Sequence, residues 1–387
     1  MKSAIILSFF LQSTIAQRLA FVGTYGGSIT TVQFDDKTGA LKQLFTNKNS
    51  APAPSWQEVS ANQKFLYTIE ETSSKNQSQG ALTSYSIKAD GQLNNVSTVL
   101  GMAGPVNLAI SPDQTLIFTA NYGSASVSAY STNTATGELS WLKSWERKLS
   151  KPGVVPDRQE ASHPHQAVFE STGKFVLVPD LGADIIRMFS IKPGPDLTEL
   201  DPIKMKPGSG PRHGVFYPPT GKPKFYFLVS ELDNTVTVFS VEYGSDALKL
   251  AEVQSISTLP ANYSKARGPA AGEIVVHPNS KYVYVSNRLE AVFPNASSIA
   301  SYEVDASSGH LKLLEIFNSG VMNLRHLSIH PSGKWLITEG QNSNNMKSFK
   351  LDPATGKVEQ KESSVLTIEK PACLQWLKVE RKNKCSS

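Results

Sequence analysis

One phrase recurs along the chain at intervals of roughly 50 to 60 residues, and this internal repeat constrains the fold more than any other feature. Each copy has an apolar run, a turn at Pro or Gly-Lys, a second apolar run, a polar turn and a third run. The copies begin at Ser55, Val106, His165, Arg212, Gly272 and Arg325. This interval accommodates four strands and their turns, which is one blade of a β-propeller.

The runs are rich in Val, Ile, Phe and Tyr, and Gly, Pro, Asn and Asp separate them, as is typical of strands and hairpins. Residues 19–46 match the second, third and fourth strands of a blade, and residues 371–379 match a first strand. Joined, they would form a seventh blade that closes the ring and leaves no open sheet edge. The sequence therefore predicts an all-β fold, a seven-bladed β-propeller of four-stranded antiparallel blades, as one domain over residues 17–380. Two β-sandwiches are the alternative, but they would need a break in the repeat midway.

The N-terminus has the pattern of a signal peptide. Lys2 is the lone charge before an apolar stretch that is too short to span a bilayer, and small residues at Thr14 and Ala16 favour cleavage after Ala16. A buried first strand or helix is the alternative. No later stretch reaches the about 18 apolar residues of a membrane span. We therefore expect a secreted protein with a short basic tail at residues 381–387, and an extracellular or cell-wall partner would fit such a protein.

Four Asn-X-Ser sequons fit export, because this triplet is the acceptor for N-glycosylation. They begin at Asn76, Asn95, Asn262 and Asn295. The chain has two cysteines, Cys373 and Cys385. They could form a disulfide in an oxidising compartment, or Cys373 could be buried while Cys385 is a free thiol of the tail. Both interpretations remain open.

Charge and motifs argue against several function classes. The excess of 38 basic over 33 acidic residues gives a net charge of +5, without a basic cluster, so nucleic-acid binding is not expected. Neither a zinc site nor a cysteine nucleophile has the partners it needs. The acidic groups of the repeat could serve Ca²⁺ or Mg²⁺, but no ligand loop is evident. We therefore predict no metal and no cofactor.

Aligning the copies gathers polar residues at one end of the propeller. The start of a first strand and the end of the antiparallel second strand lie on the same face, so residues at both points converge on the channel mouth. The predicted cluster contains Arg212, Arg288, Arg325, His165, His213, His326, Glu231, Glu273, Asn121 and Gln166. Several arginines at one mouth would repel each other unless carboxylates or an anionic ligand compensate them.

At these residues the chain resembles a known family. The segments HPHQAVF, GSGPRHGVFYP, VSELDNTVTVFSV, GEIVVHPNSKYVYVSNR and RHLSIHPSGKWL are similar in combination to the seven-bladed lactonase family. That family includes propeller-type 6-phosphogluconolactonases and the fungal 3-carboxy-cis,cis-muconate cyclase. The resemblance covers nearly the whole chain after residue 16 and implies a catalytic cluster of His165, Arg212, Glu231 and Arg288. Glu273 is a second candidate for the carboxylate, and the other residues of the predicted cluster would bind substrate.

These residue types suit the hydrolysis of a small anionic lactone. Arg212 and Arg288 can bind phosphate or carboxylate groups through charge-assisted hydrogen bonds. Either Glu231 or His165 could be the base that activates water. Cyclisation of a carboxymuconate-type substrate by the same residues is one alternative, and a secreted binding propeller without catalysis is another. Because the family's named substrates are cytosolic metabolites, the predicted signal peptide leaves the substrate open.

Overall fold

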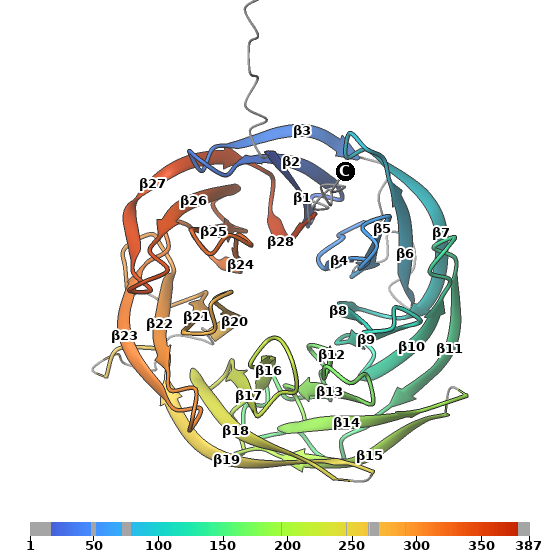
Figure 1. Ribbon diagram of the computed structural model, residues 1–387. Helices are drawn as coiled ribbons and strands as arrows, with labels where there is room; N and C mark the ends of the chain where they lie inside the picture. The colour runs from blue at the N-terminus through green and yellow to red at the C-terminus, as the bar shows by residue number, and fades with distance from the viewer. Residues whose placement is uncertain are drawn as a thin grey trace, which may run out of the picture.

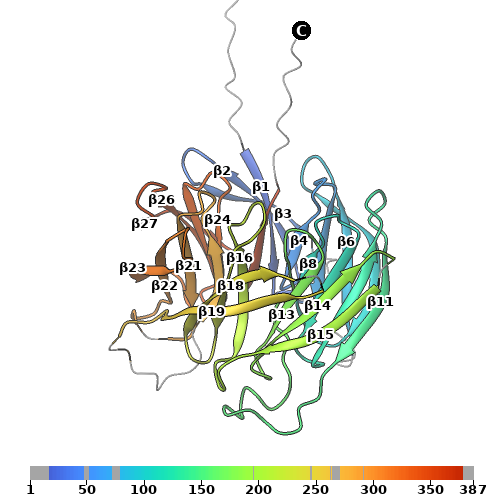
Figure 2. The ribbon, with the colours of Figure 1, turned by 60° about the horizontal axis from the view of Figure 1, so that its bottom comes forward.

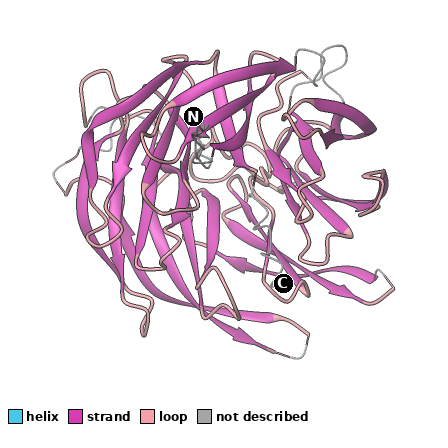
Figure 3. Ribbon diagram, turned by 45° about the horizontal axis from the view of Figure 1, so that its top comes forward, coloured by secondary structure: helices cyan, strands magenta, loops and turns pink. Residues whose placement is uncertain are grey.

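The computed structural model describes residues 17–47, 52–71, 79–194, 196–244, 246–261, 263, 271–290 and 292–377. These residues form 28 strands, joined by turns and loops, in seven four-stranded antiparallel sheets around one axis (Figures 1 and 3). The predicted seven-bladed β-propeller is therefore confirmed. The described part of the chain contains no helix of the length and apolarity that a bilayer span needs. The predicted signal peptide, the basic tail and Cys385 lie outside the described residues.

The blades are numbered here along the chain, and their strands are given from the axis outward. Blade 1 contains β4 (Gln57–Val59), β5 (Phe65–Glu70), β6 (Gln79–Ile87) and β7 (Leu93–Met102). Blade 2 contains β8 (Pro105–Ile110), β9 (Leu116–Asn121), β10 (Ser126–Thr132) and β11 (Leu139–Glu146). Blade 3 contains β12 (Val168–Phe169), β13 (Phe175–Asp180), β14 (Ile185–Lys192) and β15 (Asp196–Lys204). Blade 4 contains β16 (Pro211–Tyr217), β17 (Phe225–Ser230), β18 (Thr235–Tyr243) and β19 (Leu248–Ser257).

The remaining blades continue the same order. Blade 5 contains β20 (Ala271–Val276), β21 (Tyr282–Asn287), β22 (Ser298–Val304) and β23 (Leu311–Asn318). Blade 6 contains β24 (Leu324–Ile329), β25 (Trp335–Gly340), β26 (Asn345–Leu351) and β27 (Val358–Thr367). Blade 7 contains β28 (Pro371–Trp376), β1 (Gln17–Thr24), β2 (Ile29–Asp35) and β3 (Leu41–Asn47).

Blade 7 joins the two ends of the chain, as the sequence predicts. The C-terminal strand β28 pairs antiparallel with β1, so that Val22 lies opposite Leu374. The buried Gln57 of blade 1 donates its amide to the carbonyls of Phe21 and Cys373 at 2.5 and 3.3 Å, which ties the closing blade to its neighbour. Cys373 is fully buried. The disulfide to Cys385 remains a prediction.

Adjacent blades pack through large apolar side chains and through the turns of the outer hairpins. Gly137, in the turn between β10 and β11, has a φ of +79°, and a Cβ there would lie 2.6 Å from the ring of Phe65 in blade 1. Asn133 opens this turn and accepts the amides of Ala135 and Thr136 through its side-chain oxygen. The turns that begin at Asp35, Asp305 and Asp352 repeat this arrangement. The turns between the third and fourth strands are therefore contacts between blades.

A one-residue bulge interrupts the inner strand of several blades directly after its first paired residue. The register of β8 with β9 shifts between Pro105 and Asn107, that of β16 with β17 between Pro211 and His213, and that of β24 with β25 between Leu324 and His326. The extra residues are Val106, Arg212 and Arg325. Because a bulged residue is left out of the ladder, its side chain is free to point along the axis.

Blade 3 differs from the prediction of a strand beginning at His165. Regular pairing in β12 covers only Val168–Phe169, because Pro179, opposite Gln166 in this register, has no N–H to donate. An isolated bridge joins Pro164 to Asp180, and the amide of His165 donates to the Pro179 carbonyl at 2.9 Å. The register therefore also shifts by one residue here, and His165 occupies the bulge position of its blade.

The turn packing gives a test of the fold with a matched control. Gly137 and Gly221 have nearly equal φ values, +79° and +77°, but a Cβ at Gly221 would meet no atom within 4 Å. Both Ala variants should lose about 1 kcal/mol of unfolding free energy from the left-handed backbone. Gly137→Ala should lose about 1–3 kcal/mol more, because its methyl group overlaps the Phe65 ring. Denaturant unfolding measures both values, and equal losses would contradict the packing role of the turn.

Candidate active site

The bulge positions of the blades meet at the channel mouth. They line a narrow cavity of about 10 Å³, which is room for about one water molecule. The lining residues are Ser55, Trp56, Val106, His165, Arg212, His213, Arg325 and Ala372. The loop between β11 and β12 lies on this face, and β1 begins at the opposite face (Figure 2).

Blade 5 has a glycine at the equivalent position, and this glycine makes room for a neighbouring arginine. A Cβ on Gly272 would lie 3.0 Å from Cδ of Arg288. The Gly272 carbonyl also accepts a hydrogen bond from a terminal guanidinium nitrogen of Arg212 at 2.7 Å. The missing side chain therefore makes room for Arg288, whereas Arg212 only uses the backbone carbonyl of this residue.

Glu231, which follows β17, forms ion pairs with three arginines and is fully buried. Its Oε2 lies 2.8 Å from Nε of Arg212 and 2.8 Å from a terminal nitrogen of Arg288. Its Oε1 accepts a hydrogen bond from Arg158 at 2.8 Å. Although burial opposes ionisation, the charges of Arg288, Arg212 and Arg158 hold the pKa of Glu231 at about 2. Glu231 is therefore an ionised anchor for arginines and a weak base at neutral pH.

Arg158 belongs to the loop between β11 and β12, so the alignment of copies could not find it. The amide of Gln159 fastens this loop to the propeller by donating to the Leu181 carbonyl at 3.0 Å. The ring of His163 stacks on Tyr122 with a centroid separation of 3.9 Å. The Arg158 side chain is 29% exposed, whereas those of Arg212 and Arg288 are 2% and 8% exposed. Arg158 is thus the most accessible cation on Glu231.

A chain of hydrogen-bonded groups runs from the mouth toward blade 5. Nδ1 of His165 lies 3.1 Å from Nε2 of His213, and Nδ1 of His213 lies 3.1 Å from a carboxylate oxygen of Glu273. Burial, Arg212 and the other nearby cations lower the pKa of His165 well below its usual value. Burial likewise lowers the pKa of His213 to about 4, although Glu273 opposes this shift. Both imidazoles are therefore neutral at neutral pH.

His326, in blade 6, has the opposite protonation preference. Its Nδ1 lies 2.9 Å from a carboxylate oxygen of Glu339, and its Nε2 lies 4.0 Å from Glu273. Although burial opposes it, Glu339 and Glu273 together raise the pKa of His326. Trp56 separates the two kinds of histidine, with its ring edge-to-face against both His213 and His326 at 5.3 and 5.5 Å. His326 therefore balances buried carboxylates.

Arg325 lies in a second polar group at the mouth. It donates to the Tyr25 hydroxyl at 2.6 Å, and that hydroxyl donates to Glu71 at 2.6 Å. Burial raises the pKa of Tyr25, so the phenol stays neutral and bridges the two charges. Tyr25 and Glu71 each follow a second strand by one residue, as Arg288 does, but the sequence prediction did not include them.

Asn121 and Gln166 use their amides for protein contacts. The side chain of Asn121 accepts from Thr119 at 2.9 Å and donates to Ser126 and Ser128 at 3.0 and 2.8 Å, all within blade 2. The side-chain oxygen of Gln166 accepts the amide of Gly214 in the next blade at 2.6 Å. Both residues are buried, and these contacts give them a structural role.

Two of the four sequons lie in the described part of the chain. Asn95 is exposed in β7, and Asn295 is exposed in the loop between β21 and β22. Asn76 and Asn262 lie outside the described residues. Glycan attachment at any of the four remains a prediction.

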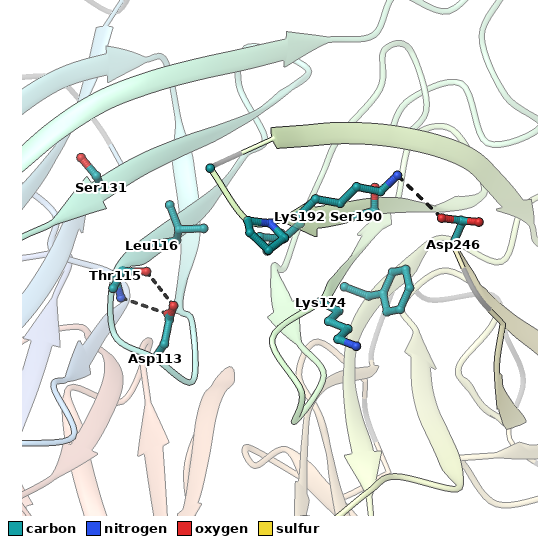
Figure 4. A pocket seen from close by; sticks show the side chains of 12 residues that line it. Asp113, Thr115, Leu116, Ser131, Lys174, Ser190, Lys192 and Asp246 are labelled. Atoms are coloured by element: carbon teal, nitrogen blue, oxygen red, sulfur yellow. Dashed lines mark hydrogen bonds and ion pairs between the residues drawn. The ribbon is translucent and has the colours of Figure 1, made fainter.

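A larger cavity of about 700 Å³ lies away from the mouth, between blades 2, 3 and 4 (Figure 4). Its charged groups are Asp113, Lys174, Lys192 and Asp246. Lys192 is paired with Asp246 at 3.6 Å, and Asp113 accepts from Thr115. Among the described residues, no histidine or arginine lines this cavity, so it does not repeat the polar cluster of the channel mouth. Within the described residues, no group of three or more His, Cys, Asp or Glu side chains could hold a metal ion.

Known proteins are similar to this chain over the whole propeller. Residues 19–376 match the family described as "Lactonase, 7-bladed beta-propeller". A relative from Arthroderma benhamiae named "Probable 6-phosphogluconolactonase" is 56% identical over 94% of this chain and 89% of its own. The 6-phosphogluconolactonase of Bacillus subtilis is 29% identical over 93% of this chain and 98% of its own. The solved structure of the periplasmic gluconolactonase of Pseudomonas aeruginosa has a TM-score of 0.83 at 26% identity, covering 93% of this chain and 99% of that chain.

The ion pairs of Glu231 predict how stability depends on pH. Its pKa is about 2 in the folded protein and 4.5 in the ordinary case. Its contribution to the unfolding free energy is therefore complete above about pH 4.5 and is lost as the pH falls toward 2, because only the unfolded chain binds the proton there. The slope of the unfolding free energy against pH reports how many more protons the unfolded chain binds than the folded protein. Glu231→Gln should reduce this number by about one in that interval.

Glu146→Gln, at an exposed glutamate of β11, is the matched control and should keep the wild-type slope. Denaturant unfolding at a series of acid pH values measures all three proteins. Glu231→Gln should also lower the unfolding free energy at neutral pH by about 3–5 kcal/mol, because it leaves buried arginines uncompensated. A Glu231→Gln protein with the full wild-type slope would show that the carboxylate is not held ionised by these arginines.

Proposed function

Because the chain belongs to the lactonase family of seven-bladed β-propellers, we propose that it hydrolyses a small sugar lactone that carries an anionic group. The chain is a lactone hydrolase by this relationship. The first substrate to test is 6-phosphogluconolactone, for which its relatives are named. The observation that carries the proposal is a cluster of arginines around Glu231 beside the neutral imidazole of His165.

The charge of this cluster favours an anionic ligand. Glu231 supplies one negative charge to the three guanidinium groups that contact it, so two positive charges remain uncompensated by this carboxylate. Arg212 is buried, and burial together with Arg288 lowers its pKa to about 9. A phosphate or carboxylate group at the mouth would relieve this repulsion through charge-assisted hydrogen bonds.

His165 is the base of the proposed reaction. Its Nδ1 is engaged by His213, so a neutral ring offers Nε2 to a water molecule in the narrow cavity. As Nε2 takes a proton from the water, the water oxygen bonds to the lactone carbonyl carbon, and Arg212 stabilises the oxyanion. The carbon–oxygen bond of the ring then breaks, and His165 returns the proton to the leaving oxygen. Water and lactone become a hydroxy acid, and the histidine is regenerated.

Glu231 is less suited to this role than the sequence suggested. A carboxylate with a pKa of about 2 has little affinity for a proton at neutral pH, and both of its oxygens are engaged by arginines. We assign it to positioning Arg212, Arg288 and Arg158. Cyclisation of a muconate and a purely binding role are less favoured, because the relatives are named as lactonases.

We also propose that the protein acts outside the cytosol. Support comes from the signal-like residues 1–16, from the sequons and from the exposure of Asn95 and Asn295. The structural relative from Pseudomonas aeruginosa is described as periplasmic and as a gluconolactonase. An unphosphorylated gluconolactone is therefore the second candidate substrate. An extracellular or cell-wall partner remains a prediction from the sequence.

Hydrolysis is tested by incubating the purified protein with 6-phosphogluconolactone, gluconolactone and carboxymuconate. Hydrolysis of the lactones should release acid, and the ultraviolet absorbance of the muconate should not change. His165→Asn should reduce lactone turnover by about 10² to 10⁴-fold, because it removes the base. No turnover of any lactone by the folded wild-type protein, or full turnover by His165→Asn, would contradict the proposal.

Arg158 tests recognition of the anionic group. Arg158→Gln should raise KM for the phosphorylated lactone about tenfold or more, because one charge-assisted contact is lost, and should change kcat little. KM for the unphosphorylated lactone should change much less. Arg147→Gln is the matched control, since Arg147 lies in the same loop, is 33% exposed and pairs with Glu199. Equal effects of both variants on both substrates would argue against a contact between Arg158 and the phosphate.

A further inference from the structure

We propose that His213 and Glu273 are positioning residues that fix the tautomer of His165 and carry the charge of the proton that it removes from water. The role in turnover rests on the proposed lactone hydrolysis. The hydrogen bonds themselves are a property of the resting protein and can be measured without a substrate.

The tautomers follow from the order of donors and acceptors. Glu273 is ionised, because the neighbouring imidazoles hold its pKa at about 2 although burial opposes this. A carboxylate only accepts, so Nδ1 of His213 carries the proton of this hydrogen bond. The other nitrogen of a neutral His213, Nε2, then has a lone pair, which accepts a hydrogen bond from the protonated Nδ1 of His165. His165 is left with an unprotonated Nε2, which is the nitrogen that a base needs.

The same contacts determine where positive charge is least costly. His165 is near three cations, those of Arg212, Arg288 and Arg325, in addition to His213. His213 is also near Arg212 and Arg325, but it has the Glu273 carboxylate at 3.1 Å. A charge on His213 is therefore paired, whereas a charge on His165 is surrounded by like charges. Trp56 and His326 enclose the other side of this pair.

The relay balances as two coupled proton transfers. The O–H bond of water breaks as Nε2 of His165 gains a proton, and the Nδ1–H bond of His165 breaks as Nε2 of His213 gains a proton. The charge then lies on His213, in contact with Glu273. When the ring oxygen leaves, both transfers reverse, and His165 gives the proton on Nε2 to that oxygen. No oxidant, reductant or further reactant is needed.

The kinetic test compares two buried carboxylates of the mouth. Glu273→Gln should reduce the plateau of kcat/KM by about 10 to 100-fold, as for other groups that orient a reacting ligand. It should also move the acid limb of the pH profile to lower pH, because loss of the carboxylate lowers the pKa of the histidine pair. Arg212, Arg288 and Arg325 also face this pair and are not altered by the variant, whereas His326 loses the Glu273 carboxylate that helps to raise its pKa.

Glu339→Gln is the matched control, because Glu339 is equally buried but contacts His326 and no member of the relay. It should change the plateau and the acid limb much less. Circular dichroism and thermal unfolding report whether each variant is folded. Equal pH profiles for Glu273→Gln and the wild type would overturn the relay.

Nitrogen-15 NMR of the imidazole rings tests the resting tautomers without turnover. In the full wild-type chain at neutral pH, both His165 and His213 should carry their proton on Nδ1, with His165→Asn and His213→Asn used to assign the signals. A proton on Nε2 of His165 would overturn the relay, whether or not lactones are hydrolysed. The predicted tautomers together with no lactone turnover would instead refute the proposed function and leave the hydrogen-bonded chain intact.

Discussion

The loss of ladder pairing at the mouth end of the inner strands determines what the propeller can offer a ligand. An inner strand whose pairing continued to its end would direct every side chain toward one neighbouring blade or the other. The bulge in blades 2, 4 and 6, and the equivalent shift in blade 3, leave one residue per blade outside this packing. Since the strands converge on the axis, these released residues meet in one cavity. The chemistry of the mouth therefore depends on which side chain occupies a single position in each blade.

Charge compensation decides the role of each group at that mouth. Glu231 and Glu273 are both buried carboxylates with a pKa of about 2, but for different reasons. Guanidinium groups hold Glu231 ionised, and imidazoles hold Glu273 ionised. In the proposed reaction, the first arrangement positions cations for an anionic ligand, whereas the second connects a carboxylate to groups that exchange protons. Under this proposal, anion binding and proton transfer occur in two neighbouring networks of the mouth.

Much of the fold and part of the site could be predicted from the sequence, because both depend on the repeat. The seven blades, the joined terminal strands and the convergence of Arg212, Glu231 and Arg288 all follow from the position of a residue within its copy. Arg158 lies between copies, in a loop whose path no periodicity determines, so its contact with Glu231 could not be predicted. Residue type also could not show that Gln166 satisfies the amide of Gly214. That assignment depends on a hydrogen bond between blades, which only coordinates reveal.

The residues at the bulge positions and their equivalents differ in chemical character around the ring. Val106, and Ala372 at a register shift of blade 7, offer only apolar surface. His165 offers the proposed base, Arg212 and Arg325 offer cations, and Gly272 leaves space for Arg288. Because these residues lie outside the ladder, the chemical character of the position can differ between blades while the strands of each blade remain paired. The fold therefore permits many ligands, and the selection of one depends on the asymmetry of the mouth. Here cations and a neutral imidazole adjoin a narrow cavity, and a lactone with an anionic group needs both of these features.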